Sequence, residues 1–358
     1  MKIIIDAMGG DNAPLEIVKG ALLGMEHWGV EVLLTGDTEA ILRALRDCGH
    51  DTIPHGMEIV HTTETVDMCD DPSKVFRHKK DTSMGVGLTL LRDGKADALV
   101  SAGSTGALLA GATLITKRIR GIRRAALAPV VPNARGNMVL IDCGATAEGT
   151  PEYLLQFAFM GAYYARRFLG IENPRVGLLN IGTEPSKGME LQKAAHALLT
   201  QAHEAGRIRF VGNIEGREAI SQGAADVLVT DGFTGNVCLK TIEGTAKTLM
   251  RNLKAALMST ALSKVGALLV KGPLGALKEK MSPDTYGGTP LLGVKGAVIV
   301  GHGSSNETAV KNGIAVAAAT VRAHVPEVIA ERVAAAPASA SAAVGAEEEG
   351  EAAASDAR

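Results

Sequence analysis

Short runs of aliphatic and β-branched residues alternate along the chain with longer segments in which apolar residues recur every three or four positions. This alternation predicts an α/β fold in which crossover helices cover a mostly parallel sheet. Helix start signals lie between the runs, at Asn12, Thr150 and Ser305, and the last precedes a helix predicted over 306–321. The predicted strands are 2–5, 30–34, 58–61, 98–100, 138–141, 176–179, 208–211, 227–229 and 297–300.

A motif that consists of a strand, a glycine turn and a helix start occurs twice in the sequence. Residues 96–106 (ADALVSAGSTG) and 225–235 (ADVLVTDGFTG) match at a constant offset of 129. The carboxyl ends of parallel strands face the ligand crevice, and a helix N-terminus there offers unpaired N–H groups to an anion. Glycine in such a turn also has a purely steric explanation, but the repetition favours two half-sites around one anion. Their candidate residues are Gly103, Ser104, Thr105, Gly106, Asp231, Thr234 and Gly235.

Two polar side chains follow strands at the same predicted edge. Lys187 lies in a loop between Gly182 and Gly188, after a strand that ends near 180. A lysine there can hold a phosphate or a developing oxyanion, although most exposed lysines only increase solubility. Asn236 follows the second copy of the repeat and can donate its amide N–H to the same anion, or it can bond the helix backbone.

Two further motifs are candidates to line the ligand-binding site. The segment 6–11 (DAMGGD) ends the first strand with Gly9 and Gly10, which permit a close backbone approach to a ligand, beside Asp6. A metal site there has little support because no second acidic array accompanies it. The segment 302–305 (HGSS) favours a helix cap with His302 and Ser304 lining the site, since a hydrolase nucleophile would need a G-x-S-x-G elbow. Gly85 and Gly87 lack the third glycine of a dinucleotide fingerprint.

Composition narrows the class of protein. The chain has 358 residues with 46% hydrophobic and 21% charged side chains, enough to bury a core without disulfides. Aromatic residues are only 3%, which argues against stacking on nucleic acid. Four scattered cysteines fit a reducing compartment, and no secretory signal or run of 18 apolar residues is found, so we expect a cytoplasmic protein.

Charge is distributed unevenly along the chain. The net charge of −2 divides into −4 on the acidic end from 337 and +2 on the rest. The Ala/Ser/Pro/Glu-rich stretch has no apolar periodicity, which predicts a disordered tail over 334–358 after a folded unit over 1–333. One basic cluster, for which a solvated helix end is the default explanation, consists of Lys117, Arg118, Arg120, Arg123 and Arg124.

A second basic segment covers 247–280. It carries seven cations against Glu279 alone, and its apolar residues follow helical spacing. Seven cations exclude a buried core helix, and Lys264 argues against a membrane span. We therefore predict protruding amphipathic helices that contact an anionic membrane surface through Leu257, Leu262 and Leu269. A dimer interface or a carrier-protein groove is the alternative, since both also require apolar residues.

The motifs together resemble the bacterial phosphate acyltransferase family over about 1–332. They are 6–11 (DAMGGD), 101–107 (SAGSTGA), 142–145 (DCGA), 177–184 (GLLNIGTE), 230–236 (TDGFTGN) and 302–305 (HGSS). Ser104 and Thr146 depart from the family pattern, which has asparagine at both positions. The resemblance implies a three-layer α/β/α fold like that of isocitrate and isopropylmalate dehydrogenases, usually in a homodimer, without an organic cofactor.

The resemblance also implies an activity. The family transfers a long-chain fatty acyl group from acyl carrier protein to inorganic phosphate, and a membrane glycerol-3-phosphate acyltransferase then consumes the acyl phosphate. Lys187 and Asn236 stand at the positions thought to be catalytic, and we expect the basic cluster at 117–124 to help dock the acidic carrier protein. A short-chain, coenzyme A-dependent phosphotransacetylase and a non-catalytic membrane or carrier-protein adaptor remain as alternatives. Chain-length preference and any role of a divalent ion stay open.

Overall fold

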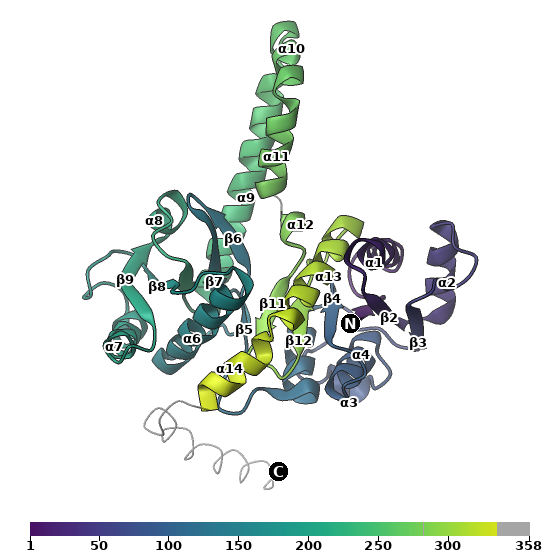
Figure 1. Ribbon diagram of the computed structural model, residues 1–358, viewed down its shortest axis with the longest axis horizontal. Helices are drawn as coiled ribbons and strands as arrows, with labels where there is room; N and C mark the ends of the chain where they lie inside the picture. Colours follow the sequence, from purple (N-terminus) through teal and green to yellow (C-terminus); the bar gives the residue numbers. More distant parts are fainter. Residues whose placement is uncertain (282, 335–358) are drawn as a thin grey trace.

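The computed structural model describes residues 1–281 and 283–334, and it arranges them around two β-sheets (Figure 1). The first sheet has the order β3-β2-β1-β4-β12-β11-β5 and the second the order β6-β7-β10-β8-β9. Most pairings are parallel, so the predicted α/β class is confirmed, with the strands divided between two sheets. The strands are β1 Lys2–Asp6, β2 Glu31–Gly36, β3 Met57–His61, β4 Ala98–Ser101, β5 Ala126–Leu127, β6 Val130–Asn133, β7 Gly136–Ile141, β8 Arg175–Asn180, β9 Arg209–Glu215, β10 Val227–Val229, β11 Thr289–Leu292 and β12 Ala297–Val300.

All nine predicted strands are present, and three further strands are β5, β6 and β11. These three make the antiparallel pairings: β11 pairs with β12 and β5, and β6 pairs with β7. Pro132 and Pro290 lie inside β6 and β11, and β5 has only two residues. Proline lacks the N–H group for a sheet ladder, so strands that are very short or contain proline have weak sequence signals.

Helices cover both sheets and begin close to the predicted positions. The Thr150 side chain accepts a hydrogen bond from the Tyr153 N–H at the start of α6, as its position predicted. The cap of α13 is Asn306, one residue beyond the expected Ser305. The helices of the body are α1 Leu15–Trp28, α2 Thr38–Asp47, α3 Val75–His78, α4 Ser83–Arg92, α5 Thr105–Gly111 with a π-helical turn Ala112–Lys117, α6 Pro151–Phe168, α7 Glu190–Glu204, α8 Gly216–Ser221, α13 Glu307–Arg322 and α14 Val325–Ala334.

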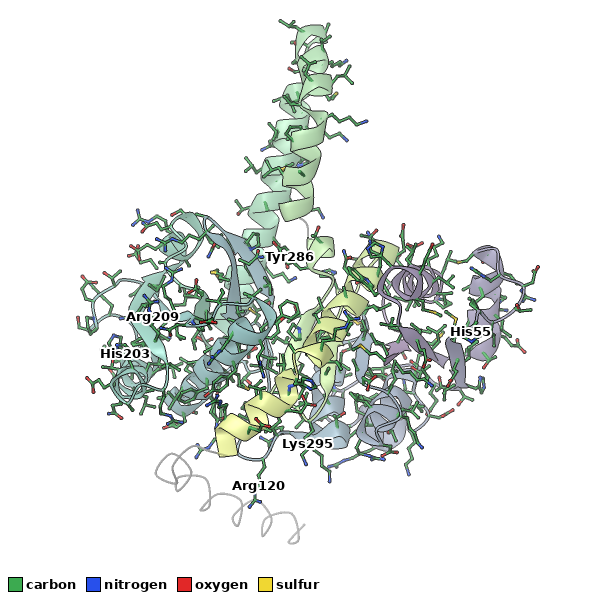
Figure 2. All side chains as sticks on the ribbon, in the orientation of Figure 1. His55, Arg120, His203, Arg209, Tyr286 and Lys295 are labelled. Atoms are coloured by element: carbon green, nitrogen blue, oxygen red, sulfur yellow. The ribbon has the colours of Figure 1, made fainter. Side chains whose placement is uncertain are left out.

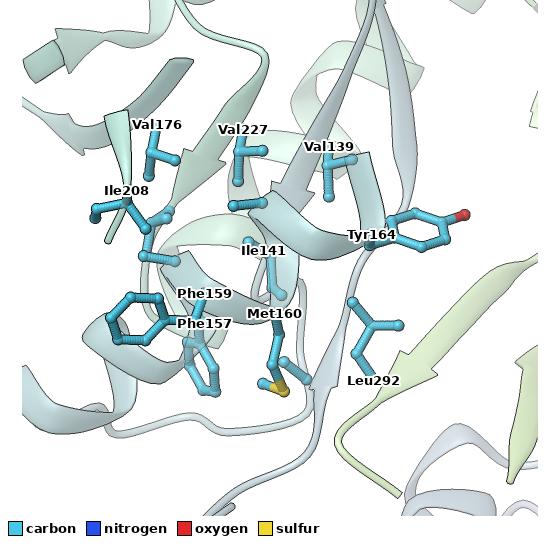
Figure 3. Packing of buried hydrophobic residues seen from close by; sticks show 14 of the residues in the cluster. Val139, Ile141, Phe157, Phe159, Met160, Tyr164, Val176, Ile208, Val227 and Leu292 are labelled. Carbon is cyan, nitrogen blue, oxygen red and sulfur yellow. The ribbon is translucent and has the colours of Figure 1, made fainter. Parts of the chain in front are cut away.

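The two sheets are joined by shared apolar packing. Helix α6 places Phe157, Met160 and Tyr164 against strands of the second sheet, and Leu292 from β11 of the first sheet packs into the same cluster (Figure 3). Another cluster combines Ile4 of β1 with residues of β7 and β10. Burial of this apolar surface at about 25 cal/mol per Å² is the main force that holds the sheets in one orientation.

A helical hairpin projects from the body. It consists of α9 Gly232–Leu257, α10 Ala261–Leu269 and α11 Lys271–Met281, with α10 at the tip, and α12 Pro283–Tyr286 leads back to β11 (Figure 1). Leu262 and Leu269 are 83% and 81% exposed near the tip, as a surface contact requires. Leu257 is half-buried, so it offers less apolar surface to a membrane than Leu262 and Leu269 do.

Some predictions fall outside the described residues. The side chains of Lys278 and Lys280 are among these, and so is the predicted tail from 335 onward, while Ala334 still belongs to α14. Among the described residues, no group of three or more His, Cys, Asp or Glu side chains is placed to hold a metal ion. Within the same residues no single helix is long and apolar enough to cross a membrane, although α13 and α14, bent by 43°, pass that test as a pair.

Candidate active site

A cleft of about 1670 Å³ lies where the carboxyl ends of strands from both sheets meet the base of the hairpin. The first copy of the sequence repeat contributes to its wall, and the second copy ends directly before a residue of the wall. The first copy supplies Thr105 and Gly106 at the start of α5, and the second leads into Asn236 on α9. The loop after β12 adds His302 and Ser304. The structure therefore brings five of the predicted site residues to one space.

Asp6 lies behind this wall and does not line it. Its carboxylate is 1% exposed and accepts hydrogen bonds of 2.6 Å from both Ser83 Oγ and Ser101 Oγ. Burial raises the pKa of Asp6, although the two serine hydroxyls partly oppose this effect. A Cβ on Gly9 would meet the Gly103 N–H group at 2.8 Å, so the turns after β1 and β4 touch without side chains between them. Asp6 thus holds two turns together, and our prediction that it contacts phosphate directly is not supported.

The loop after β12 is fastened to the turn after β1. The Asp11 N–H donates to the Gly303 carbonyl oxygen at 2.7 Å, and Gly10 adopts φ +104°, which favours glycine. His302 Nδ1 accepts the Ser304 N–H at 3.3 Å and lies 2.8 Å from Ser304 Oγ. Because Nδ1 accepts a hydrogen bond, a neutral His302 carries its proton on Nε2. The loop can therefore offer an imidazole N–H donor to a ligand in the cleft.

Several other residues that we predicted to bind the ligand act as helix caps instead. Ser104 is buried, and its Oγ accepts the Ala107 N–H at 3.4 Å as the cap of α5. Asp231 caps α9, since its carboxylate accepts the Thr234 N–H at 2.9 Å and the Thr234 hydroxyl at 2.7 Å. The Asp231 carboxylate is already engaged in a helix cap, and a second negative charge beside phosphate would be unfavourable. Its role is therefore structural. Ser104, Asp231 and Thr234 therefore shape the half-sites, and the donors left for a ligand are backbone N–H groups and Asn236.

Asn236 is exposed on the first turns of α9 and faces the turn 143–146. A Cβ on Gly144 would lie 3.7 Å from the Asn236 Cβ, and both residues line the cleft. Gly235 fits only as glycine, because an added Cβ would overlap the Asp142 carbonyl oxygen. The side-chain amide of Asn236 is thus presented to the cleft by a closely packed backbone.

Comparison with known proteins identifies the relatives of this chain. A family model described as "Fatty acid synthesis protein" matches residues 1–328. The phosphate acyltransferase of Desulfitobacterium hafniense (strain DSM 10664 / DCB-2) is 48% identical over 317 residues, which cover 88% of this chain and 93% of that protein. The phosphate acyltransferase of Clostridioides difficile (strain 630) is 45% identical over 315 residues, 88% of this chain and 91% of the relative. The chain belongs to the phosphate acyltransferase family. It is an acyltransferase.

Solved structures agree on the fold of this acyltransferase. A phosphotransacetylase from Streptococcus pyogenes aligns with a TM-score of 0.61 at 17% identity, covering 90% of this chain and 94% of its own. A branched-chain phosphotransacylase from Enterococcus faecalis V583 aligns with a TM-score of 0.55 at 16% identity, covering 90% and 99%. A 4-hydroxythreonine-4-phosphate dehydrogenase from Klebsiella pneumoniae reaches 0.53 at 13% identity, covering 91% and 99%. At these identities the likeness concerns the fold alone, and it agrees with the dehydrogenase-like architecture that we predicted.

Lys187, the other catalytic residue predicted for this acyltransferase, is not among the described residues that line the cleft. It is 48% exposed, and its Nζ lies 4.0 Å from Glu184 Oε1 in its own loop. Asn180 Nδ2 donates to the Lys187 carbonyl oxygen at 3.1 Å, and Asn213 Nδ2 donates to the Glu184 carbonyl oxygen at 2.8 Å. Sequence reasoning missed these two asparagines, although Asn180 stands at a strand end within a quoted motif. The loop is well held, but Lys187 and Asn236 do not share the cleft wall.

The two groups of basic residues that the sequence singled out lie in different parts of the molecule. The predicted docking cluster at 117–124 includes Arg120, which lies near the end of the molecule opposite the hairpin (Figure 2). Arg124 lies over the Tyr153 ring at 5.7 Å, and among the described residues no member of the cluster lines the cleft. Six other cations of the hairpin do line it: Lys240, Lys247, Arg251, Lys254, Lys264 and Lys271. We name these six residues the hairpin cations.

Proposed function

We propose that this enzyme transfers a long-chain fatty acyl group from acyl carrier protein to inorganic phosphate. The observation that carries the proposal is the cleft itself. It combines the helix start at Thr105 and Gly106, Asn236 and His302 with an apolar wall along α9. Such a space suits a ligand that has an anionic group at one end and a hydrocarbon chain at the other.

The reaction needs no enzyme nucleophile. A phosphate oxygen attacks the thioester carbonyl carbon, the carbonyl oxygen takes up negative charge, and the C–S bond then breaks to release the carrier thiolate, which takes a proton from solvent. At neutral pH phosphate already presents an anionic oxygen, so the site mainly has to orient it and stabilise the developing oxyanion. Asn236 donates its amide N–H to the developing oxyanion. We assign to Lys187 the binding of phosphate or of the oxyanion.

Apolar side chains near the site support a long acyl chain. Leu239, Ile242, Ala246 and Met250 follow one face of α9 and line the cleft. Across 239–250, at about 1.5 Å per residue, this stripe covers about 17 Å, comparable to one leaflet of a ~30 Å hydrocarbon core. A short-chain phosphotransacetylase would leave most of this stripe exposed to water.

The hairpin also suggests where the reaction takes place. Leu262 and Leu269 expose apolar surface near its tip, between cations of the same segment, and each basic residue near an anionic leaflet contributes about 1 kcal/mol. We therefore propose a cytoplasmic enzyme, a homodimer, that binds the membrane surface through its hairpins. This placement would release a lipid-like acyl phosphate beside the membrane glycerol-3-phosphate acyltransferase that consumes it.

Substrate comparison tests the proposal. The purified protein is incubated with phosphate and either palmitoyl-acyl carrier protein or acetyl-coenzyme A, and acyl phosphate is trapped as its hydroxamate. We expect product from the carrier-linked substrate. Product from acetyl-coenzyme A alone would identify a short-chain phosphotransacetylase, and product from neither would favour a non-catalytic adaptor.

A further inference from the structure

Each half-site of the cleft is built around a buried carboxylate. In the first half, Asp6 ends β1, which pairs with β4, the strand before the Gly103 turn. In the second half, Asp142 follows β7, which pairs with β10, the strand before the Gly232 turn. The glycines occupy equivalent positions: a Cβ on Gly103 would lie 3.5 Å from Asp6 Oδ2, and one on Gly232 would lie 2.5 Å from Asp142 Oδ2. Asp142 is therefore the structural counterpart of Asp6.

The Asp142 carboxylate connects the turn 143–146 to β5. It is fully buried, and Oδ2 accepts the Thr146 N–H at 2.7 Å. Oδ1 accepts the Ala145 N–H at 3.1 Å and the Leu127 N–H at 2.9 Å. Leu127 belongs to β5 of the first sheet, so one side chain fastens the turn 143–146 of the second sheet to the first sheet.

The same turn supports Asn236. The Gly232 N–H donates to the Thr146 carbonyl oxygen at 2.9 Å, which fixes the start of α9 to the turn. Gly144 lies beside Asn236 in the cleft wall, with φ +123°. Any shift of the turn would therefore move both the backbone beside Asn236 and the helix that carries it.

We propose that Asp142 is a positioning residue that acts through the turn 143–146 to place Asn236 for catalysis. This inference rests on the proposed function, because it assigns Asp142 a role in phosphate acyl transfer. Asp142 does not touch substrate. Its carboxylate is required as an acceptor of three backbone N–H groups, which an amide of the same size cannot match, since one end of an amide is itself a donor.

The test is a double-mutant cycle between Asp142→Asn and Asn236→Ala, with kcat and the KM for phosphate as readouts. Each single variant should lower kcat by about 10- to 100-fold, the effect of a misplaced or missing donor. If Asp142 acts through Asn236, the double variant should fall within about threefold of Asn236→Ala alone. The matched control is Asp226→Asn, which removes another partly buried carboxylate of the second sheet, bonded to Arg175, and should lower Tm without changing kcat.

Two results would overturn the inference: multiplication of the two single effects in the double variant, or an Asp142→Asn variant that loses thermal stability but keeps its kcat. Should that variant not fold, Gly144→Ala perturbs the same turn and leaves Asp142 in place. It should likewise be non-additive with Asn236→Ala. Additive effects of Gly144→Ala and Asn236→Ala would also exclude the turn 143–146 as the means by which Asn236 is positioned.

Failure of the proposed function gives a different result. If the wild-type protein forms no acyl phosphate, the function is wrong, and the cycle is measured instead on the Kd for inorganic phosphate by calorimetry. Non-additive losses of phosphate affinity would then still support positioning of Asn236 by Asp142. Additive losses, or unchanged phosphate affinity in both single variants, would reject it.

Discussion

At the scale of single residues, Asn236 is the predicted catalytic side chain that the structure places in the cleft. Its amide should donate to the oxyanion, so Asn236→Ala should lower kcat by about 10²-fold. Asn236→Asp should be at least as harmful, because it puts a negative charge beside phosphate. Steady-state kinetics of both variants check this order, and an aspartate variant more active than the alanine variant would exclude the donor role.

Lys187 is the second predicted catalytic residue, although it does not line the cleft. Lys187→Ala should lower turnover by about 10²-fold if its ammonium binds phosphate or the oxyanion, and circular dichroism should show an unchanged fold. Lys193→Ala is the matched control, since Lys193 is also exposed and also pairs with a glutamate, at 3.2 Å. Near-native acyl phosphate formation by the Lys187 variant would remove this residue from the mechanism.

The sequence predicted chemistry better than it predicted contacts. Residue types at strand ends indicated Asn236, His302 and the helix start at Thr105 and Gly106, and the structure brings these together. Ser104 and Asp231 are engaged as helix caps with partners three residues further on, a local pattern that could have been recognised. The sequence could not show that Asp6 is also occupied, because its partners lie 77 and 95 residues away. Pairings over such distances follow from tertiary packing, which local patterns do not contain.

At the scale of elements, β8 and the segment before β10 are joined by Arg175 and Asp226. Arg175 Nη2 and Nε donate to the two Asp226 oxygens at 2.7 and 3.0 Å. Burial alone would raise the pKa of Asp226, but these hydrogen bonds outweigh it and hold the pKa below its usual range. The folded state is therefore stabilised above pH ~4, and this contribution is lost as the pH falls through the folded pKa.

We expect Asp226→Asn to lower the free energy of unfolding by about 3 kcal/mol at pH 7, since it leaves Arg175 without its anion. Urea denaturation at several pH values should show the difference from wild type shrinking below pH ~4. Glu190→Gln, which removes an exposed partner of Lys193, should cost under about 1 kcal/mol. A difference between Asp226→Asn and wild type that does not depend on pH would contradict the assigned pKa shift.

The amphipathic character of the hairpin was predicted for 247–280, whereas the start of α9 at Gly232 and the fold into two arms were not. Leu262→Glu with Leu269→Glu should abolish cosedimentation with anionic liposomes, because both side chains are exposed near the tip and insertion would bury their apolar surface. Ile53→Glu is a control on the body, where Ile53 is 44% exposed. Persistent binding would reject the membrane contact, and dissociation of a dimer would assign the tip to the subunit interface.

At the scale of the whole molecule, the two groups of cations offer the carrier protein two docking faces. The hairpin cations line the same cleft as Asn236, so reversing Lys240 and Lys247 to Glu should raise the KM for the carrier-linked substrate more than reversing Arg118 and Arg120. The effect should weaken with added salt. A larger effect from Arg118 and Arg120 would assign docking to the cluster at 117–124 instead.

The central claim is that a phosphate oxygen attacks the acyl thioester in the cleft. The most direct measurement is mass spectrometry of the product formed from palmitoyl-acyl carrier protein and phosphate labelled at every oxygen with a heavy isotope. We predict palmitoyl phosphate that retains all the labelled oxygens, since the bond to the acyl carbon forms through one of them. Free palmitate with unlabelled oxygen, without acyl phosphate, would mean that water attacks the thioester and would contradict the account.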